Sequence, residues 1–381
     1  MKQPASIEIS QKAQELKSRG VNIIDLSVGQ PDFQPPINAN IMHKVLSQEN
    51  HSGYSSPFGI PELRTLISTY VNQKHDTSLS AGNIIVTPGA KLGLLYTINA
   101  LCPRDSQIII PEPCWLSYQE LARYSGVNIK TVPSIAINRF IPTLANILAA
   151  IVPSTKAVLI NNPVNPSGVC WPSSLLRNLL TELKKRNIYL ILDAIYDDFD
   201  FHQKIETLHA LCQSKTLSHL AYVHGFSKSL ALTGHRLGYI ASDEGTISKI
   251  ATIQSNLMTC PSTFSQHIVE QILLQDQERY ISTQVKEFKK RAAFFTAKLI
   301  EKNIPFISPD GAFYILVDTR VLTPKSAEAS MILLDKYHLA SVPGAAYGVS
   351  AEGYVRLSLT QPISILNQAI ELLAKALKKN E

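Results

Sequence analysis

The segment around Lys228 contains the residue types that covalent chemistry on an aldehyde requires. Residues 225–229 read GFSKS and follow a short apolar run that predicts a strand. Small and apolar neighbours would keep the lysine partly away from water, which lowers the pKa of its ammonium group and favours the neutral amine. A neutral amine attacks an aldehyde to form an imine. Arg236 follows eight residues later and could bind a phosphate through two hydrogen bonds. On these residues alone, a solvated loop lysine beside a structural arginine is an equally good interpretation.

Three further polar residues follow predicted strands. Asp193 comes directly after the apolar run 188–192, and Tyr196 follows it, while Asn165 lies in the turn-rich segment 161–168, NNPVNPSG. Open α/β sheets bind ligands at the carboxyl ends of parallel strands. A carboxylate there can hold a protonated ring nitrogen, and a phenol or an amide can bind a ring oxygen. A helix N-cap and an ordinary turn are the alternative interpretations of these two segments.

Residues 87–91, TPGAK, join a predicted strand to a predicted helix. Backbone N–H groups at the start of a helix form an anion site. The segment contains neither the G-x-G-x-x-G motif of dinucleotide-binding folds nor the G-K-[ST] of a P-loop. By itself it is weak evidence for an anion-binding turn.

The elements that must position these residues follow from the alternation of apolar runs and helical patterns. Short continuous apolar strands between helices are typical of a mostly parallel sheet covered on both faces. We expect strands at 23–28, 84–86, 107–110, 157–160, 188–192, 221–223 and 237–240, and a long helix over about 264–301, in which the pattern leaves room for a break at any point. The fold is therefore predicted to be α/β. A large domain, 46–283, would carry a seven-stranded-type sheet, and a smaller α+β domain would combine 1–45 with 284–381.

The composition narrows the class of protein. A chain of 381 residues is long for one core, and a charged fraction of 17% weakly indicates surface buried against another subunit. The net charge of +6 comes without a dense basic tract, which argues against nucleic-acid binding. Five cysteines without a CxxC pair, and histidines without ligand spacing, indicate free thiols and no metal site. Without a signal-peptide pattern or an apolar run of 18 residues, a soluble cytoplasmic protein is expected.

Together these segments resemble the fold type I pyridoxal-phosphate enzymes, and most closely the class I/II aminotransferases. The likeness covers nearly the whole chain and keeps the family's order. The matching segments are 27–33 SVGQPDF, 54–64 YSSPFGIPELR, 113–115 PCW, 161–168 NNPVNPSG, 225–236 GFSKSLALTGHR, 309–314 PDGAFY, 342–344 VPG and 355–358 VRLS. The N-terminal segment and the TG pair at 233–234 look most like the prokaryotic type of aspartate aminotransferase.

The resemblance implies a role for each residue around the ring of pyridoxal 5'-phosphate. Lys228 would carry the cofactor as a Schiff base and transfer the substrate proton. Asp193 would keep the pyridine nitrogen protonated, so that the ring accepts electrons. Tyr196 and Asn165 would bind the phenolic oxygen, and Trp115 would stack on the ring face.

The resemblance also implies how the phosphate is held. The backbone N–H groups of Ala90 and Lys91 and the Arg236 guanidinium would bind it. Tyr54 of the neighbouring subunit would reach the same phosphate, which would make a homodimer with shared active sites obligatory. Gly225 departs from the family, since many relatives have a hydroxyl residue there, so one phosphate donor is expected to be absent.

At the substrate end, Arg356 would clamp the α-carboxylate, helped by Gly29, Asn165 and Trp115. His235 stands where relatives often have tryptophan, and we interpret this as a packing change rather than as a catalytic base. The sequence does not show which cation would bind the distal carboxylate of a dicarboxylic substrate.

The reaction expected from the resemblance is transfer of an amino group. The donor would be an L-amino acid, aspartate-like or aromatic, and the acceptor a 2-oxo acid such as 2-oxoglutarate. A C–S lyase that performs β-elimination with the same cofactor is the main alternative. A cofactor-binding regulator is a weaker one, because such relatives carry an added helix-turn-helix domain, for which this chain has no room.

Overall fold

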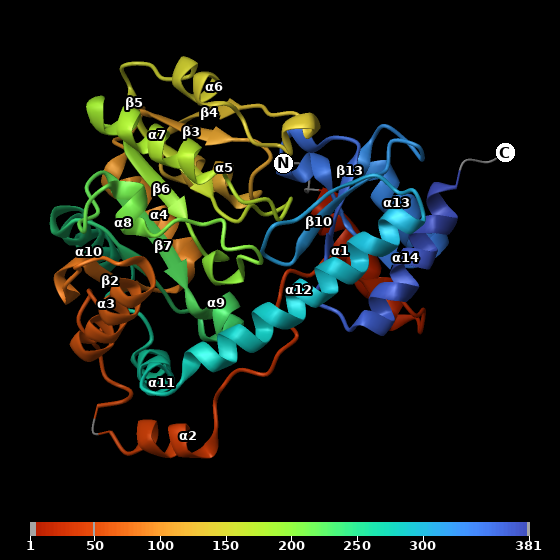
Figure 1. Cartoon of the computed structure of the whole chain (residues 1–381). Coiled ribbons are helices and arrows are strands. Elements are labelled where there is room, and N and C mark those ends of the chain that lie inside the picture. The colour runs from red at the N-terminus through yellow and green to blue at the C-terminus, as the bar shows by residue number, and fades with distance from the viewer. Residues whose placement is uncertain (1–4, 49, 379–381) are drawn as a thin grey trace.

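The largest element of the fold is a seven-stranded sheet in the computed structural model, which describes residues 5–48 and 50–378 (Figure 1). From edge to edge its strands are β2 (Ile84–Thr87), β8 (Gly238–Ala241), β7 (Leu220–Gly225), β6 (Tyr189–Asp193), β5 (Thr155–Asn161), β3 (Gln107–Pro111) and β4 (Asn128–Val132). The strands from β7 to β4 are parallel, and β8 runs antiparallel to both of its neighbours. The predicted mostly parallel sheet is therefore confirmed.

Helices cover both faces of this sheet. One face carries α3 (Pro61–His75), α6 (Leu144–Ala149), α7 (Ser173–Lys185), α8 (Leu208–Cys212) and α11 (Thr263–Leu273). The other carries α4 (Gly89–Leu101), α5 (Ser117–Tyr124) and α10 (Glu244–Met258). Along β6, Leu190 and Leu192 belong to the first core and Ile191 to the second. Because the strand is buried on both faces, its sequence is continuously apolar rather than alternating.

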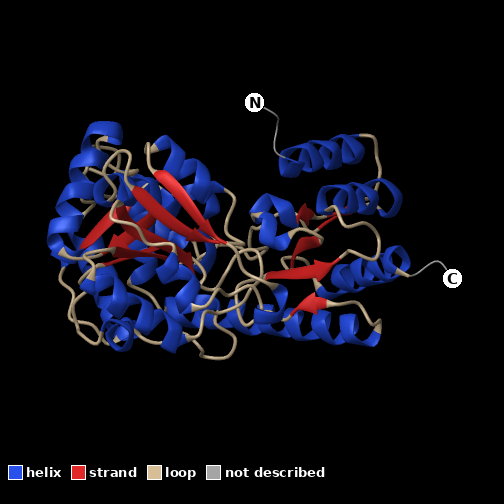
Figure 2. Ribbon diagram, turned by 90° about the horizontal axis from the view of Figure 1, so that it is seen from above, coloured by secondary structure: helices blue, strands red, loops and turns tan. Residues whose placement is uncertain are grey.

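A second, smaller sheet lies at the other end of the molecule (Figure 2). Its antiparallel strands are β12 (Val342–Pro343), β13 (Tyr354–Ser358), β10 (Tyr314–Asp318) and β9 (Phe306–Ile307). The helices that contribute to its core are α12 (Gln277–Glu301), α13 (Ser326–Tyr337) and α14 (Ile363–Leu377). Phe288, Phe295 and Phe313 fill that core. The long helix α12 connects the two ends of the molecule (Figure 1).

The N-terminal residues lie against the smaller sheet region, except for one projecting arm. Helix α1 (Ala5–Ser18) packs on α13, and β1 (Ile24–Asp25) pairs in parallel with β11 (Leu339–Ala340). Helix α2 (Ala39–Leu46) packs on α11 at the tip of an arm that extends from the molecule (Figure 1). None of the helices in the described ranges is long and apolar enough to cross a bilayer.

Two expected elements differ from those observed. The strand expected over 23–28 has only the two residues of β1, because the short strand β11 offers no longer partner. The helix expected over 264–301 is interrupted at 274–276, where the Asp276 side chain accepts the N–H of Arg279 and caps the start of α12.

Candidate active site

A cavity of about 670 Å³ lies between the carboxyl edge of the large sheet and the smaller sheet. Every predicted site residue except Tyr54 lines it: Gly29, Ala90, Lys91, Trp115, Asn165, Asp193, Tyr196, Lys228, Arg236 and Arg356. Tyr54 lies outside this lining and is 83% exposed. Residues that are far apart in the sequence thus meet in one place, because parallel strands end at the same edge of the sheet.

Lys228 lies in the short helix α9 (Phe226–Ser229), directly after β7. Its ammonium group donates to the Gly29 carbonyl at 2.7 Å. Burial lowers the pKa of Lys228 to about 8, and the positive charges of Arg356 and Arg236 act in the same direction, while Asp193 opposes them. A substantial fraction of neutral amine is therefore present near neutral pH.

Asp193 is the last residue of β6 and is buried. One carboxylate oxygen accepts the N–H of Ile195 at 3.1 Å, and the other accepts the hydroxyl of Tyr118 at 2.5 Å. Burial raises the pKa of Asp193, and the Tyr118 hydrogen bond is the strongest influence against that shift. Sequence reasoning missed Tyr118. The sequence feature that could have identified it is its spacing of three residues from Trp115, W-x-x-Y. This spacing places both rings on one side of the chain at the start of α5.

The turn after β5 is docked onto β6 by a side-chain amide. Asn161 donates to the Asp193 carbonyl at 2.9 Å and accepts the N–H of Asn165 at 2.7 Å. The buried side-chain oxygen of Asn165 has no hydrogen-bond partner among the described residues. A buried amide oxygen without a hydrogen-bond partner is costly unless a ligand supplies a donor to it.

The Tyr196 hydroxyl lies 2.9 Å from that of Tyr314.

The end of the cavity at the start of α4 can bind an anion. Helix α4 begins here, and the N–H groups of its first turn, which include those of Ala90 and Lys91, have no acceptor within the helix. Arg236 closes the cradle, and its guanidinium donates to the Thr233 carbonyl at 2.9 Å. Gly89 has a φ of +80°, which strains any other residue, and a Cβ there would lie 2.7 Å from the Arg236 guanidinium and displace it from the cradle.

The departures noted at Gly225 and His235 have structural counterparts. A Cβ at 225 would lie 3.1 Å from Gly238 Cα, so a side chain there would require β8 to move by a few tenths of an ångström. Two hydroxyl residues that were missed from the sequence, Ser227 and Thr233, line the cavity. His235 is outside the cavity lining defined by the described residues.

Arg356 projects from β13 at the substrate end. Its guanidinium donates to the Ser27 carbonyl and lies over the rings of Tyr314, at 4.5 Å, and Tyr347, at 5.6 Å. Its buried Nε has no acceptor within the described part of the chain. Two aromatic faces hold the guanidinium flat and leave donors for an incoming carboxylate.

Lys91 adds a further cation at the rim of the cavity, besides Lys228, Arg236 and Arg356. The Lys91 ammonium group is 4.8 Å from the centre of the Trp115 ring. Burial and the charge of Arg236 lower the pKa of Lys91. Lys91 was predicted to bind the phosphate through its backbone N–H, and its side chain also borders the cavity.

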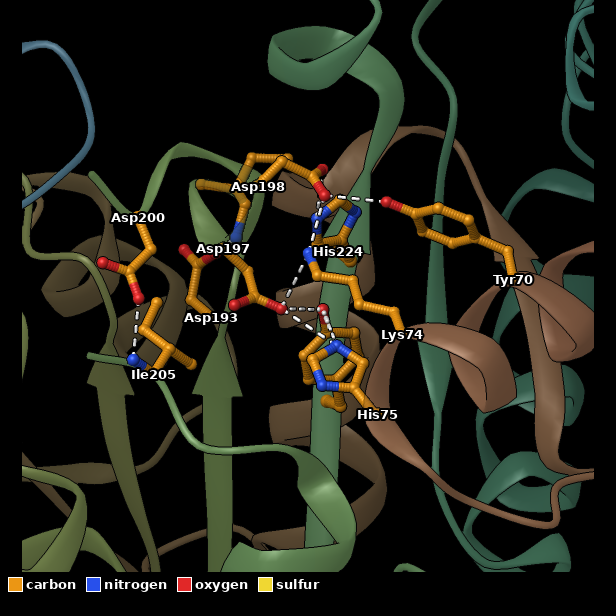
Figure 3. A network of polar contacts seen from close by, with 11 residues as sticks. Tyr70, Lys74, His75, Asp193, Asp197, Asp198, Asp200, Ile205 and His224 are labelled. Atoms are coloured by element: carbon orange, nitrogen blue, oxygen red, sulfur yellow. Dashed lines mark hydrogen bonds and ion pairs between the residues drawn. The ribbon is translucent and has the colours of Figure 1, made fainter. Parts of the chain in front are cut away.

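Behind the cavity, a buried network of charged groups holds the turn that follows Tyr196 (Figure 3). The members of this Lys74 network are Lys74, His75, Asp197, Asp198 and His224. Lys74 Nζ lies 2.6 Å from Asp198 and 3.2 Å from Asp197, and both carboxylates are buried. Burial alone would raise their pKa values, but the Lys74 charge and the neighbouring imidazoles hold both well below the usual range. The network fastens α3 to the sheet beside the candidate site.

The fold and the site have clear counterparts among known proteins. The sequence model of the family Aminotransferase class I and II matches residues 21–373. An aspartate aminotransferase of Thermotoga maritima is 32% identical over 366 residues, which cover 96% of this chain and 94% of that protein. The aspartate/prephenate aminotransferase of Thermus thermophilus is 30% identical, with 99% and 97% covered. A solved structure of aspartate aminotransferase from Thermus thermophilus with maleate has a TM-score of 0.91 at 28% identity, covering 99% of this chain and 97% of that chain.

The two-sided parallel sheet, with a partly buried lysine, a carboxylate and an anion cradle at its edge, defines a cofactor-dependent enzyme of the α/β class. The chain belongs to the aminotransferase class I and II family. Members of this family use pyridoxal 5'-phosphate, and the chain is accordingly a pyridoxal-phosphate-dependent aminotransferase. Its relatives do not favour the alternative of a C–S lyase.

We predict that Tyr118→Phe weakens cofactor binding, most strongly at low pH. Without the hydroxyl, the pKa of Asp193 rises further, and the carboxylate is neutralised at a higher pH. Loss of a hydrogen bond to a charged group costs about 1.5–3 kcal/mol, which corresponds to a shift of roughly one to two pKa units. The check is the Kd of pyridoxal phosphate between pH 5 and pH 9.

Tyr347→Phe is the matched control for this variant, because the Tyr347 hydroxyl lines the same cavity without a hydrogen-bond partner in the described chain. Its pH profile should follow that of the wild type. Identical profiles for wild type and Tyr118→Phe would show that the hydroxyl does not control Asp193.

Proposed function

We propose that each cavity residue binds the part of pyridoxal phosphate that the sequence predicts for it. The cradle of Ala90, Lys91 and Arg236 fits a phosphate, and the rim residue Trp115 offers a ring to stack on. The side chain of Asn165 lines the same cavity, and its NH2 group can donate to a polar ring substituent. The observation that carries the proposal is the partly buried Lys228 amine in one cavity with the Asp193 carboxylate and two arginines.

Bound pyridoxal phosphate supplies an electron-accepting ring that stabilises the negative charge left when the substrate loses its α-proton. The Lys228 amine, with its lowered pKa, takes that proton from the substrate α-carbon. The Asp193 carboxylate, which accepts the Tyr118 hydroxyl, would hold the ring nitrogen in its protonated form. The Tyr196 hydroxyl, 2.9 Å from that of Tyr314, would bind the phenolic oxygen.

For the substrate, we infer an aspartate-like amino donor and 2-oxoglutarate as acceptor. Arg356 suits the α-carboxylate that all amino acids share, and the adjacent Gly29 backbone borders the same space. With Lys228, Arg236 and Arg356 assigned, Lys91 is the remaining Lys or Arg side chain of the described cavity lining. Its ammonium group suits a distal carboxylate, and this supports a dicarboxylic substrate.

Aromatic substrates are the second candidate. Trp115, Tyr314 and Tyr347 present rings to the cavity. A solved aromatic aminotransferase of Pyrococcus horikoshii has a TM-score of 0.88 at 26% identity, covering 96% of this chain and 98% of that chain.

The test of both substrate classes is a panel of aspartate, glutamate, phenylalanine, tyrosine and kynurenine against 2-oxoglutarate, oxaloacetate and prephenate. Turnover with none of these pairs would refute the proposed substrates, and pyruvate released without an acceptor would indicate elimination.

Lys91→Ala separates the two substrate classes. Removing a charge-assisted hydrogen bond should raise KM for aspartate by about tenfold or more. KM for phenylalanine should stay within about twofold, because that substrate has no distal carboxylate. Steady-state kinetics with both donors check this. An equal rise for both donors would show that Lys91 acts on the cofactor instead of the distal carboxylate.

We further propose a homodimer with shared active sites. Exposed apolar side chains at the end of α10, Leu257 at 65% and Met258 at 44%, support an interface. The exposed ring of Tyr54 is available to the phosphate site of a partner. Hybrids of Tyr54→Phe and Lys228→Ala protomers test this. If Tyr54 acts across the interface, each hybrid dimer regains one site with wild-type cofactor affinity. Absence of that regain, or a monomer in sedimentation equilibrium, would refute the proposal.

The division into a large domain, 46–283, and a small domain, 1–45 with 284–381, is also proposed. Its second boundary falls within α12, which contributes to the smaller core and begins beside the large one.

A cytoplasmic location is proposed because all five cysteines, each within the described ranges, are free thiols. Limited proteolysis and cell fractionation test these two proposals. Cleavage within 46–283 before its boundaries, or recovery outside the cytoplasm, would refute them.

A further inference from the structure

Residues 26–33, called the wall segment here, form one side of the cavity without belonging to a helix or a strand. Ser27, Val28, Gly29 and Gln30 line the cavity from this segment. Among residues 5–48 and 50–378, backbone hydrogen bonds fix only its beginning: Leu26 N–H donates to the Ala340 carbonyl at 3.0 Å, and its carbonyl accepts the N–H of Ser358 at 2.8 Å. Beyond Leu26, side chains must hold the wall segment in place.

Arg291, on α12, makes the strongest of these contacts. Its two terminal nitrogens lie 2.8 and 2.9 Å from the two carboxylate oxygens of Asp32. The guanidinium also donates to the Leu359 carbonyl at 3.3 Å and to Glu287 at 3.0 Å. One side chain therefore joins the far end of the wall segment to the chain that leaves β13, the strand of Arg356.

The environment of this pair makes it stronger than a surface ion pair. Arg291 is only 5% exposed. Its guanidinium lies 5.3 Å from the Phe288 ring and 5.8 Å from the Phe33 ring, and the two rings are in edge contact. Burial of the Arg291 guanidinium and a planar two-point hydrogen bond both favour a fixed geometry, while the Asp32 side chain stays 30% exposed. A lysine could keep the charge but not the two-point hydrogen bond.

The other hydrogen bonds that the described residues make with the wall segment lie at or before Gly29. The Ser27 hydroxyl donates to Asp25 at 2.6 Å, and the Ser27 carbonyl accepts from Arg356. The Val28 carbonyl accepts from the Thr360 hydroxyl at 3.3 Å. The Gly29 carbonyl is held by the Lys228 amine at 2.7 Å. On the proposed function, on which this inference rests, that amine is committed to the cofactor and cannot anchor Gly29 at the same time. The Asp32 pair then anchors the segment beyond Gly29, together with the hydrogen bond from the Tyr280 hydroxyl to the Gln34 carbonyl, 2.7 Å long, just past its end.

We propose that Arg291 is a positioning residue for substrate binding. Through Asp32 it fixes the wall segment, and the wall segment sets the position of Gly29 relative to the Arg356 guanidinium. Because both groups face the α-carboxylate, this role affects every amino donor alike and acts on binding more than on the chemical step.

Arg291→Lys tests the proposal with two measurements. In the cofactor-free protein, hydrogen exchange of a peptide that spans 27–33 should be faster by about tenfold, since a charge-assisted fork is lost. In the loaded enzyme, KM for each active donor should rise by about tenfold, while kcat should change by less than about threefold. The exchange measurement needs no turnover, so an error in the proposed function leaves it interpretable.

Arg320→Lys is the matched control. Arg320 contacts both carboxylate oxygens of Asp318, at 3.0 and 3.1 Å from its Nε, and lies over the Tyr354 ring at 5.4 Å, but its side chain is 60% exposed and lies outside the cavity lining given by the described residues. Exchange of 27–33 and KM should not change in that variant. Asp32→Asn should reproduce the effect of Arg291→Lys, and the double variant should add little to either.

Unchanged exchange and unchanged KM in Arg291→Lys would overturn the proposal. A fall in kcat with KM unchanged, or additive effects in the double variant, would also overturn it. If wild type shows no transamination with any substrate pair while exchange of 27–33 still rises in Arg291→Lys, the anchor stands and the proposed function fails.

Discussion

Replacing Lys228 by alanine should lower transamination by at least about 10²–10⁴-fold, the usual contribution of a positioned proton-transfer group. The wild-type amine is buried beside two arginines, and its pKa is lowered to about 8. At pH 7.5 about a quarter of it is neutral, compared with roughly 0.1% for an ordinary lysine. Only the neutral form attacks an aldehyde or accepts a proton. The measurement is the rate with the best donor and acceptor at saturating pyridoxal phosphate.

The same variant has a chemical readout. After borohydride reduction, the wild-type peptide that contains residue 228 should carry a pyridoxyl mark, and the rate of cofactor loading should rise with pH through about 8. Lys91→Ala is the control, because it removes the other lysine of the cavity and should leave the mark in place. A wild-type mark elsewhere in the chain, or near-normal turnover by Lys228→Ala, would contradict the assignment.

Replacing Lys74 by methionine should cost about 3–5 kcal/mol of unfolding free energy, the usual effect of removing one partner of a buried ion pair. Lys74 is the one cation within 3.2 Å of both Asp197 and Asp198 among the described ion pairs, and both carboxylates are almost fully buried. Without it, two neighbouring negative charges stay buried, and their remaining side-chain partners carry at most an imidazole charge: His75 and Tyr222 at Asp197, and His224 and Tyr70 at Asp198. Urea unfolding of the cofactor-free protein at fixed protein concentration measures the change.

The pH dependence of this loss has a definite sign. The folded-state pKa values of Asp197 and Asp198 are depressed, so their contribution is present above the unfolded value of about 3.9 and is lost as pH falls toward the folded values. Lys74→Met should therefore differ most from wild type near pH 7 and progressively less as pH falls below about 4. Lys215→Met, which removes an exposed pair with Asp76 at 3.4 Å, should cost less than about 1 kcal/mol. A loss of similar size in both variants, or one that does not depend on pH, would refute this role of Lys74.

The sequence by itself determined which elements form and where the chemical residues fall on them. Asp193 and the segment of Lys228 follow apolar runs, and parallel strands necessarily end at one edge of a sheet. Local pattern was sufficient because the type and end of each strand depend on neighbouring residues. It failed for 26–28, which is apolar enough for a strand, because β11 is too short to pair with it.

The tertiary structure alone decided which side chains support those residues. Tyr118 meets Asp193 across 75 positions of sequence, Lys74 meets Asp198 across 124, and Arg291 meets Asp32 across 259. No local periodicity encodes such pairs, because each depends on how separate helices pack against the sheets. The same holds for Lys91, whose side chain reaches the Trp115 ring only after α4 and α5 have packed side by side. Burial then sets the charge of these groups, since a pKa depends on the water and the partners that the fold leaves around it.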